Sequence, residues 1–215
     1  MQAIGAVFDL NIQDAGLEAG VMTTLGAIDS VHAVPTGLPR IPIHEIRGRR
    51  LVGGYRALGD GTAVDVLISR DADDPGFTLV HELGHYLDHH ALGSVSGAFA
   101  SASGELADLF DAIDASDAVQ ELRDLERRAP VAFPAAAGVL VILDRDDFSY
   151  LLEPEELFAR SYAQYIAVRS ADAALLEDLL AGQGIVYPEQ WKDRDFEAVA
   201  AAFDQLLEGL GWSGS

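Results

Sequence analysis

The feature that most constrains the fold is a largely apolar segment, residues 77–87, that carries two histidines four positions apart, His81 and His85. If the segment is helical, residues four apart lie within about 40° of each other on one face, one turn apart. Two imidazoles arranged in this way can bind one divalent metal ion, and Glu82 beside the first can act on a metal-activated water. A random chain with this content of His and Glu would contain about 0.01 such patterns. Because unpartnered His and Glu are costly to bury, the segment predicts a metal-binding helix rather than a solvent-facing helix with incidental histidines.

Composition limits the class of protein and of metal site. The 215 residues with 49% hydrophobic content are typical of one globular domain with a sizeable core. The chain has no cysteine, so any metal must be held by histidines and carboxylates. The net charge of −21 disfavours binding to nucleic acid. Neither a signal peptide nor an apolar stretch near 18 residues is visible, which predicts no membrane span and a protein that is cytoplasmic or delivered without a signal peptide.

The sequence predicts a small sheet ahead of the metal helix. Residues 13–33 have helical periodicity, whereas segments 41–46, 51–58 and 62–69 have strand character. Asp60-Gly61 predicts a hairpin between the last two, so we expect a mainly antiparallel sheet packed on the metal helix. Strand 62–69 is either an edge strand that pairs with an extended substrate or an interior strand. Asp74 as N-cap and Pro75 at the first helical position predict the start of the metal helix, which then extends to about residue 92.

The second half of the chain is mostly helical in prediction, which makes the fold class α+β. Helices are expected within 105–128 and over 153–168, 171–181 and 195–210. The small-residue segment 93–104 is either a mobile loop near the site or a plain linker, and 131–143 is either a strand or a buried turn. We expect a single domain over 1–215, with an N-terminal helical segment (1–39), a core (40–170) and C-terminal helices (171–215).

A third metal ligand has to come from outside the metal helix. Asp88 lies about 7.5 Å along the axis from the expected metal position, too far for a short carboxylate, so we expect it to orient a neighbouring side chain of the site or to have a structural role. Glu156 is the better candidate. It shares a helix face with Ala159 and Ala163, whose small side chains would let that helix approach the metal helix closely. The neighbouring Glu153 is more simply explained as a first-turn acid favoured by the helix dipole.

These segments resemble a known family. His81-Glu-Leu-Gly-His-Tyr-Leu-Asp88 and Glu156-Leu-Phe-Ala-Arg160 are similar to the H-E-x-G-H-x-x-D and E-x-F-A motifs of zincins like anthrax lethal factor, a group that includes phage MuF-like and polymorphic-toxin domains. The resemblance covers about residues 40–170. It implies a zincin-like fold, a Zn²⁺ ion, and a tyrosine upstream of the third ligand that assists the transition state. The implied residues are His81, His85 and Glu156 as zinc ligands, Glu82 as general base and Tyr150 as the assisting tyrosine, with Tyr162 and Tyr165 as substitutes.

The resemblance implies a zinc metallopeptidase, an endopeptidase acting on a peptide or protein substrate. The alternative is a non-catalytic zincin-fold module that binds a partner, such as a phage or toxin accessory protein; the presence of Glu82 favours the enzyme. Mn²⁺ or Fe²⁺ would also suit two histidines and a carboxylate. The sequence does not specify the oligomeric state.

The remaining histidines and the only basic cluster have simpler expected roles. His32 and His44 are expected to be structural or exposed, and His89 and His90 exposed. The cluster either recognises acidic substrate residues or pairs with the protein's own carboxylates; it comprises Arg40, Arg47, Arg49, Arg50 and Arg56.

Overall fold

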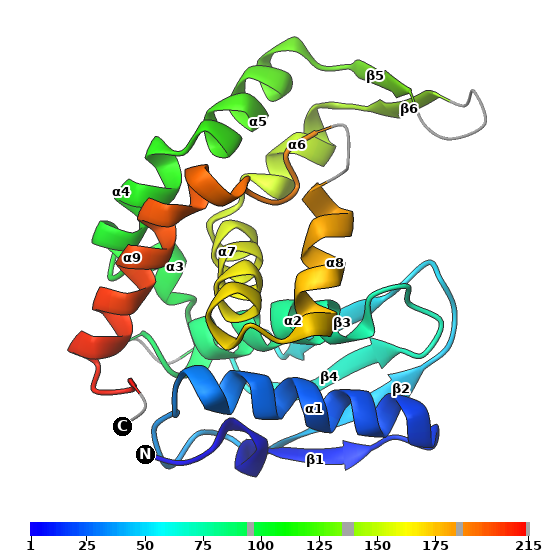
Figure 1. The fold of residues 1–215 in the computed structure, drawn as a ribbon, viewed down its shortest axis with the longest axis vertical. Helices are drawn as coiled ribbons and strands as arrows, with labels where there is room; N and C mark the ends of the chain where they lie inside the picture. Colours follow the sequence, from blue (N-terminus) through cyan, green and yellow to red (C-terminus); the bar gives the residue numbers. More distant parts are fainter. Residues whose placement is uncertain (94–96, 135–139, 184–186, 214–215) are drawn as a thin grey trace.

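The computed structural model describes residues 1–93, 97–134, 140–183 and 187–213. A four-stranded sheet and helix α1 (Ala15–Val31) form one side of the molecule, and the remaining helices stack on the other side of helix α2 (Pro75–His90), as Figure 1 shows. The predicted α+β class is confirmed. None of the described helices combines the length and apolar character needed to cross a membrane.

The main sheet is mixed, so the prediction of a mainly antiparallel sheet is wrong. Its strands are β1 (Phe8–Asn11), β2 (Ile41–Ile46), β3 (Gly53–Ala57) and β4 (Ala63–Ser69), in the order β1-β2-β4-β3. The β1–β2 and β2–β4 pairs are parallel, and only β3–β4 is antiparallel. Helix α1 connects β1 to β2, and such a crossover returns the chain in the same direction. Strand β1 was not predicted because four residues are too few to display a periodicity.

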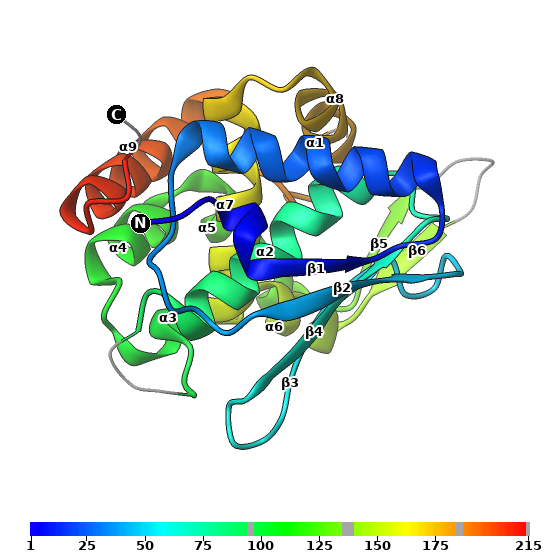
Figure 2. The ribbon, with the colours of Figure 1, turned by 90° about the horizontal axis from the view of Figure 1, so that it is seen from below.

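The hairpin prediction is confirmed, and it decides which strand is at the edge. Strands β3 and β4 are joined through Asp60-Gly61, with Gly61 at a φ of 83° that favours glycine. Strand β4 lies between β2 and β3 and is therefore an interior strand. The free edge on this side is β3, which lies beside α2 (Figure 2).

Helix α2 begins where the sequence predicts, although its cap differs. Asp74 is the N-cap residue and Pro75 follows at the first position. The Asp74 carboxylate makes no hydrogen bond to the first-turn backbone and accepts instead from the Thr78 hydroxyl at 3.2 Å. Most residues between Phe77 and His89 are buried, as expected for a helix between the sheet and the helical half.

The second half contains helices and one small hairpin. The hairpin confirms the strand alternative for 131–143, whose residues 135–139 lie outside the described part of the chain. Of the segment 93–104, residues 100–103 form a helical turn and 94–96 are not described. A short helix before α7 was not predicted. The elements are α3 (Ala100–Ser103), α4 (Ala107–Ala115), α5 (Asp117–Arg128), β5 (Val131–Pro134), β6 (Leu140–Leu143), α6 (Arg145–Leu151), α7 (Pro154–Ser170), α8 (Ala173–Gln183) and α9 (Asp193–Gly209).

Helices α2 and α7 approach each other closely at Gly84. A Cβ atom at Gly84 would lie 3.0 Å from the Cα of Ala159 and 3.2 Å from Cδ1 of Tyr162. Real Cβ atoms rarely come this close to a backbone carbon, so the glycine sets the separation of the two helices. Gly84 lies between His81 and His85 on α2, and it meets the second turn of α7. The close contact therefore positions the first turn of α7 beside the two imidazoles.

Candidate metal centre

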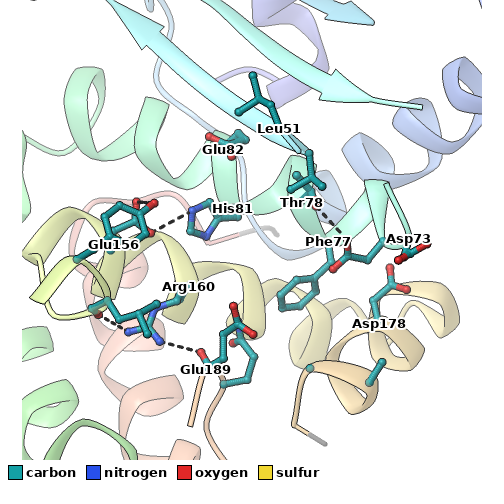
Figure 3. Close-up of a pocket in the computed structure, with 18 of the residues that line it drawn as sticks. Leu51, Asp73, Phe77, Thr78, His81, Glu82, Glu156, Arg160, Asp178 and Glu189 are labelled. Atoms are coloured by element: carbon teal, nitrogen blue, oxygen red, sulfur yellow. Dashed lines mark hydrogen bonds and ion pairs between the residues drawn. The ribbon is translucent and has the colours of Figure 1, made fainter. Parts of the chain in front are cut away.

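His81, His85 and Glu156 converge at one point between α2 and α7. The Nε2 atoms of the two histidines are 3.1 Å apart. The Glu156 carboxylate reaches them from the first turn of α7, with Oε2 3.4 Å from His81 Nε2 and Oε1 3.2 Å from His85 Nε2. Figure 3 shows Glu156 facing His81 across this gap. The structure thus brings together the three residues that the sequence nominated as ligands.

These three side chains lie close enough together to hold one metal ion, since one possible ligand atom of each lies within 4.8 Å of the others. Zinc bonds to nitrogen and carboxylate oxygen are about 2.0–2.2 Å long, which places neighbouring ligands of a tetrahedron about 3.3 Å apart. The two Nε2 atoms, 3.1 Å apart, match that value, and each lies at a similar distance, 3.2 or 3.4 Å, from a different oxygen of the Glu156 carboxylate. Two imidazoles and one carboxylate are also a ligand set of catalytic zinc sites, which keep the fourth position open.

The Glu156 carboxylate and the His85 imidazole shift each other's pKa in opposite directions. Burial acts to raise the pKa of Glu156, but the hydrogen bonds and charges of the two histidines lower it far below its ordinary value. Burial acts to lower the pKa of His85, but the adjacent Glu156 carboxylate, with smaller contributions from Glu82 and Asp88, raises it. These opposite shifts follow from the mutual attraction of the carboxylate and the imidazole.

Tyr150 lies next to the candidate ligands, at the end of α6. Its hydroxyl donates a hydrogen bond to Glu156 Oε1 at 2.6 Å, and its side chain is about half exposed. The substitutes lie elsewhere. The Tyr162 hydroxyl is 2.8 Å from Nε2 of the buried His32, and Tyr165 donates to Asp204 at 2.9 Å. Of the three tyrosines, Tyr150 alone contacts the site.

Glu82 is held by the backbone of the edge strand. Its Oε2 accepts a hydrogen bond from the N–H of Tyr55 in β3 at 2.7 Å. Burial raises its pKa, although the nearby histidine charges act in the opposite direction. A Cβ atom at Gly53 would overlap Thr78 Cγ2 and lie 2.9 Å from Glu82 Oε1, so only glycine lets the strand lie this close to the helix. Neither the hydrogen bond from the Tyr55 N–H nor the close approach at Gly53 was predicted from the sequence. A backbone donor has no sequence signature, and the approach depends on how the strand packs on the helix.

These groups line one cavity of about 600 Å³. Its walls come from α2, from residues 50–53 at the start of the edge strand, from the end of α6, from α7 and from α8. His81, Glu82, Tyr150 and Glu156 all line it. An extended chain that enters past residues 50–53 would therefore meet the candidate ligands and the candidate base together.

Asp88 has the structural role expected of it, but His89 does not lie where it was expected. Asp88 is fully buried and accepts from the backbone N–H and the hydroxyl of Ser101, at 2.8 and 2.6 Å. Burial raises its pKa to about 6. His89 is 5% exposed, so the prediction of exposure is wrong: its ring stacks on Phe99 and its Nδ1 lies 2.8 Å from the Tyr55 hydroxyl. Chain that follows α2 covers this end of the helix, which helix periodicity alone does not indicate.

The basic cluster contacts the protein's own carboxylates. Arg40 pairs with Asp9, Arg49 with Asp73 and Arg56 with Asp65. These pairs favour the self-pairing alternative over recognition of acidic substrate residues. Of the other two arginines, Arg50 lies at the exposed rim of the cavity.

In comparisons with protein-family models, with curated proteins and with solved structures, nothing matched the chain. The zincin resemblance therefore consists of the two motifs in the sequence.

Proposed function

We propose that the protein is a zinc-dependent metallopeptidase of the zincin type, acting as an endopeptidase on peptide or protein substrates. The observation that carries this proposal is the convergence of His81, His85 and Glu156 from helices that are distant in the sequence, with one possible ligand atom of each residue within 4.8 Å of the others. A buried glutamate and a tyrosine hydroxyl lie in the same cavity, where a peptidase needs a base and a hydrogen-bond donor.

His81, His85 and Glu156 would hold the zinc ion. When bound, zinc acts as a Lewis acid that polarises a carbonyl group and makes a water molecule more acidic. Zinc requires its imidazole ligands to be neutral and its carboxylate ligand to be ionised.

Glu82 would serve as the general base. The Tyr55 N–H holds its Oε2, which fixes the orientation of the carboxylate. Burial raises its pKa, which makes it a stronger proton acceptor for the attacking water, and it would later deliver that proton to the leaving amine.

Tyr150 would stabilise the oxyanion that develops on the scissile carbonyl. Burial and the Glu156 carboxylate raise the pKa of its phenol, so it remains a hydrogen-bond donor at neutral pH. Its hydroxyl contacts Glu156 in this structure, and a modest rotation of this half-exposed side chain would redirect it to the substrate.

Strand β3, rather than the strand 62–69 considered in the sequence analysis, would pair with an extended substrate. It is the free edge on the cavity side, and Gly53 and the residues before it line the cavity. An extended peptide can add to such an edge through backbone hydrogen bonds.

The decisive experiment compares wild type with Glu82→Gln on a peptide library, with zinc content measured on both. We expect about one zinc per chain in both proteins and a loss of cleavage of at least about 100-fold in the variant. Glu155→Gln, which removes a neighbouring acid outside the cavity lining, is the matched control and should cleave normally. Zinc-loaded wild type that cleaves nothing would support the alternative of a binding module, and elemental analysis distinguishes zinc from manganese or iron.

A further inference from the structure

The side chain of Tyr55 joins the edge strand β3 to the last turn of α2. Its hydroxyl lies 2.8 Å from Nδ1 of His89 and 2.7 Å from Nε2 of His90. A phenol has one proton and two lone pairs, so it can donate to one imidazole and accept from the N–H of the other. Burial raises the pKa of this phenol, which therefore keeps its proton at neutral pH. Tyr55 thus contacts α2 through its hydroxyl as well as through the backbone N–H that donates to Glu82.

These contacts lie at two levels of the same helix. Glu82 and His89 are seven positions apart, which corresponds to about 10 Å along the helix axis. Tyr55 and the Glu82 side chain together span this distance, with the backbone N–H at one end and the hydroxyl at the other. A residue held at both ends cannot slide along the helix or turn away from it without breaking a hydrogen bond. The position of the N–H at Glu82 is therefore coupled to the position of the hydroxyl.

The neighbours of Tyr55 in the strand contribute little to fixing it on α2. The two preceding residues are Gly53 and Gly54, which have no side chain to hold and a permissive backbone. In the described part of the chain, β3 pairs with β4 alone, and the ladder is irregular between Arg56 and Ala57, directly after Tyr55. Such irregularities disrupt pairing locally. Tyr55 therefore supplies the first side chain of β3 that can hold the strand to the helix.

The imidazole of His89 is itself held in place. Its ring stacks on Phe99, with ring centroids 4.6 Å apart and planes inclined by 15°. Two residues before Phe99, the same segment contacts the tip of the β3–β4 hairpin, where a Cβ atom at Gly61 would overlap the Cα of Gly97. The chain that follows α2 thus fixes the hairpin at its tip and also packs behind the imidazole that Tyr55 contacts.

We propose that Tyr55 is a positioning residue for the candidate general base: its hydroxyl, held by His89 and His90, fixes β3 on α2 and so holds the N–H that orients Glu82. We call Tyr55, His89 and His90 the Tyr55 anchor. The inference rests on the proposed peptidase function, because it concerns the base of that site. Among the described residues, the lining of the cavity does not include Tyr55, so its effect would reach the chemistry through Glu82. A misplacement of about 1 Å in a catalytic group can lower a rate about 100-fold.

Tyr55→Phe removes the hydroxyl and keeps both the ring and the backbone N–H. With a peptide that wild type cleaves, we expect kcat to fall about tenfold and KM to change less than about twofold, with zinc content unchanged. Tyr86→Phe is the matched control, because it also removes a hydroxyl hydrogen bond of α2, the 2.6 Å bond to the backbone oxygen of Pro39. Its kcat should match that of wild type.

A double-mutant cycle tests whether the hydroxyl acts through the imidazoles. His90→Leu should lower kcat less than Tyr55→Phe does, because the contact with His89 remains. Adding His90→Leu to Tyr55→Phe should cause no further loss, since the hydroxyl is already gone. Two effects that multiply in the double variant would overturn the anchor. If Tyr55→Phe does not fold, His90→Leu is compared with His90→Gln, which keeps a polar group beside the hydroxyl; a lower kcat in the leucine variant supports the anchor, and equal values overturn it.

Amide hydrogen exchange in the full chain, followed by NMR, measures the same effect without a substrate. The amide at position 55 should exchange at least about tenfold faster in Tyr55→Phe than in wild type, because the strand is then held less firmly at Glu82. The amide of Ser101, which donates to Asp88 at 2.8 Å, is the internal reference and should not change. A fall in kcat without faster exchange at position 55 would overturn the anchor, since the loss would then not come through this N–H.

The anchor and the peptidase function fail in different ways. Cleavage that depends on Glu82 but is unaffected by Tyr55→Phe overturns the anchor alone, and so does loss of zinc from Tyr55→Phe, which would place the effect on the metal ligands. If no cleavage depends on Glu82, the peptidase proposal fails, and amide exchange then decides whether Tyr55 holds the strand at Glu82. Faster exchange at position 55 in Tyr55→Phe supports that role, and unchanged exchange overturns it.

Discussion

Replacing Gly84 with alanine tests whether the separation of α2 and α7 positions the candidate metal ligands. The new methyl group would lie 3.0 Å from the Cα of Ala159, a backbone atom that cannot move without the rest of α7. Overpacking of this kind costs about 1–3 kcal/mol. A glycine-to-alanine change inside a helix returns up to about 1 kcal/mol through helix propensity. We therefore expect a net destabilisation between about 0 and 3 kcal/mol.

Gly26→Ala is the matched control, because it makes the same change inside α1 where a Cβ meets no atom within 4 Å. It should stabilise the chain by up to about 1 kcal/mol. Both variants gain the same helix propensity, so this gain cancels when their free energies of unfolding in urea are compared. We expect Gly84→Ala to be less stable than Gly26→Ala by about 1–3 kcal/mol. Zinc affinity, measured by competition with a chromophoric chelator, should fall about tenfold in Gly84→Ala only, since a shift of α7 moves Glu156. Equal stabilisation by both substitutions would refute the close approach of the two helices.

Three further substitutions examine the surroundings of the site. Tyr150→Phe should lower kcat about 10- to 100-fold with little change in KM or zinc content, and a lowered zinc content would instead indicate a role in metal binding. Gly53→Ala, whose methyl would overlap Thr78 and crowd Glu82, should lower kcat at least tenfold while zinc is retained; unchanged turnover would contradict the tight packing of β3 on α2. Asp88 has a pKa raised from 3.8 to about 6, so the stability that its neutral form provides is lost as the pH rises through about 6. For the metal-free chain, the free energy of unfolding of Asp88→Asn, measured in urea, should therefore rise relative to that of wild type between pH 4 and 7, by up to about 3 kcal/mol. A difference between the two proteins that stays constant over this pH range would contradict a raised pKa.

Those features of the site that depend on local geometry could be predicted from the sequence. Helical spacing alone places His81 and His85 on one face, and Pro75 marks the start of their helix. The hairpin at Asp60-Gly61 follows from turn chemistry. The small residues Ala159 and Ala163 indicated a close helix approach, and the structure places the first of them against Gly84. The roles of these residues in metal binding and catalysis stay predictions.

Features that depend on tertiary contacts could not be predicted. The parallel pairing of β2 follows from the path of the chain over α1, which no local pattern encodes. The hydrogen bond to Glu82 comes from a backbone N–H that any residue at position 55 could supply. Tyr150 was named through a motif resemblance, and its contact with Glu156 depends on a seven-residue helix, α6, that is too short to predict by periodicity. The burial of His89 depends on Phe99, which lies on the other side of a small-residue segment.

Zinc content per chain, measured by mass spectrometry after dialysis against metal-free buffer, tests the central claim most directly. Wild type should retain about one zinc ion, His81→Ala and Glu156→Ala should each retain far less, and His44→Ala should match wild type. Zinc that is absent from wild type, or that survives the loss of Glu156, would contradict a metal centre shared by α2 and α7.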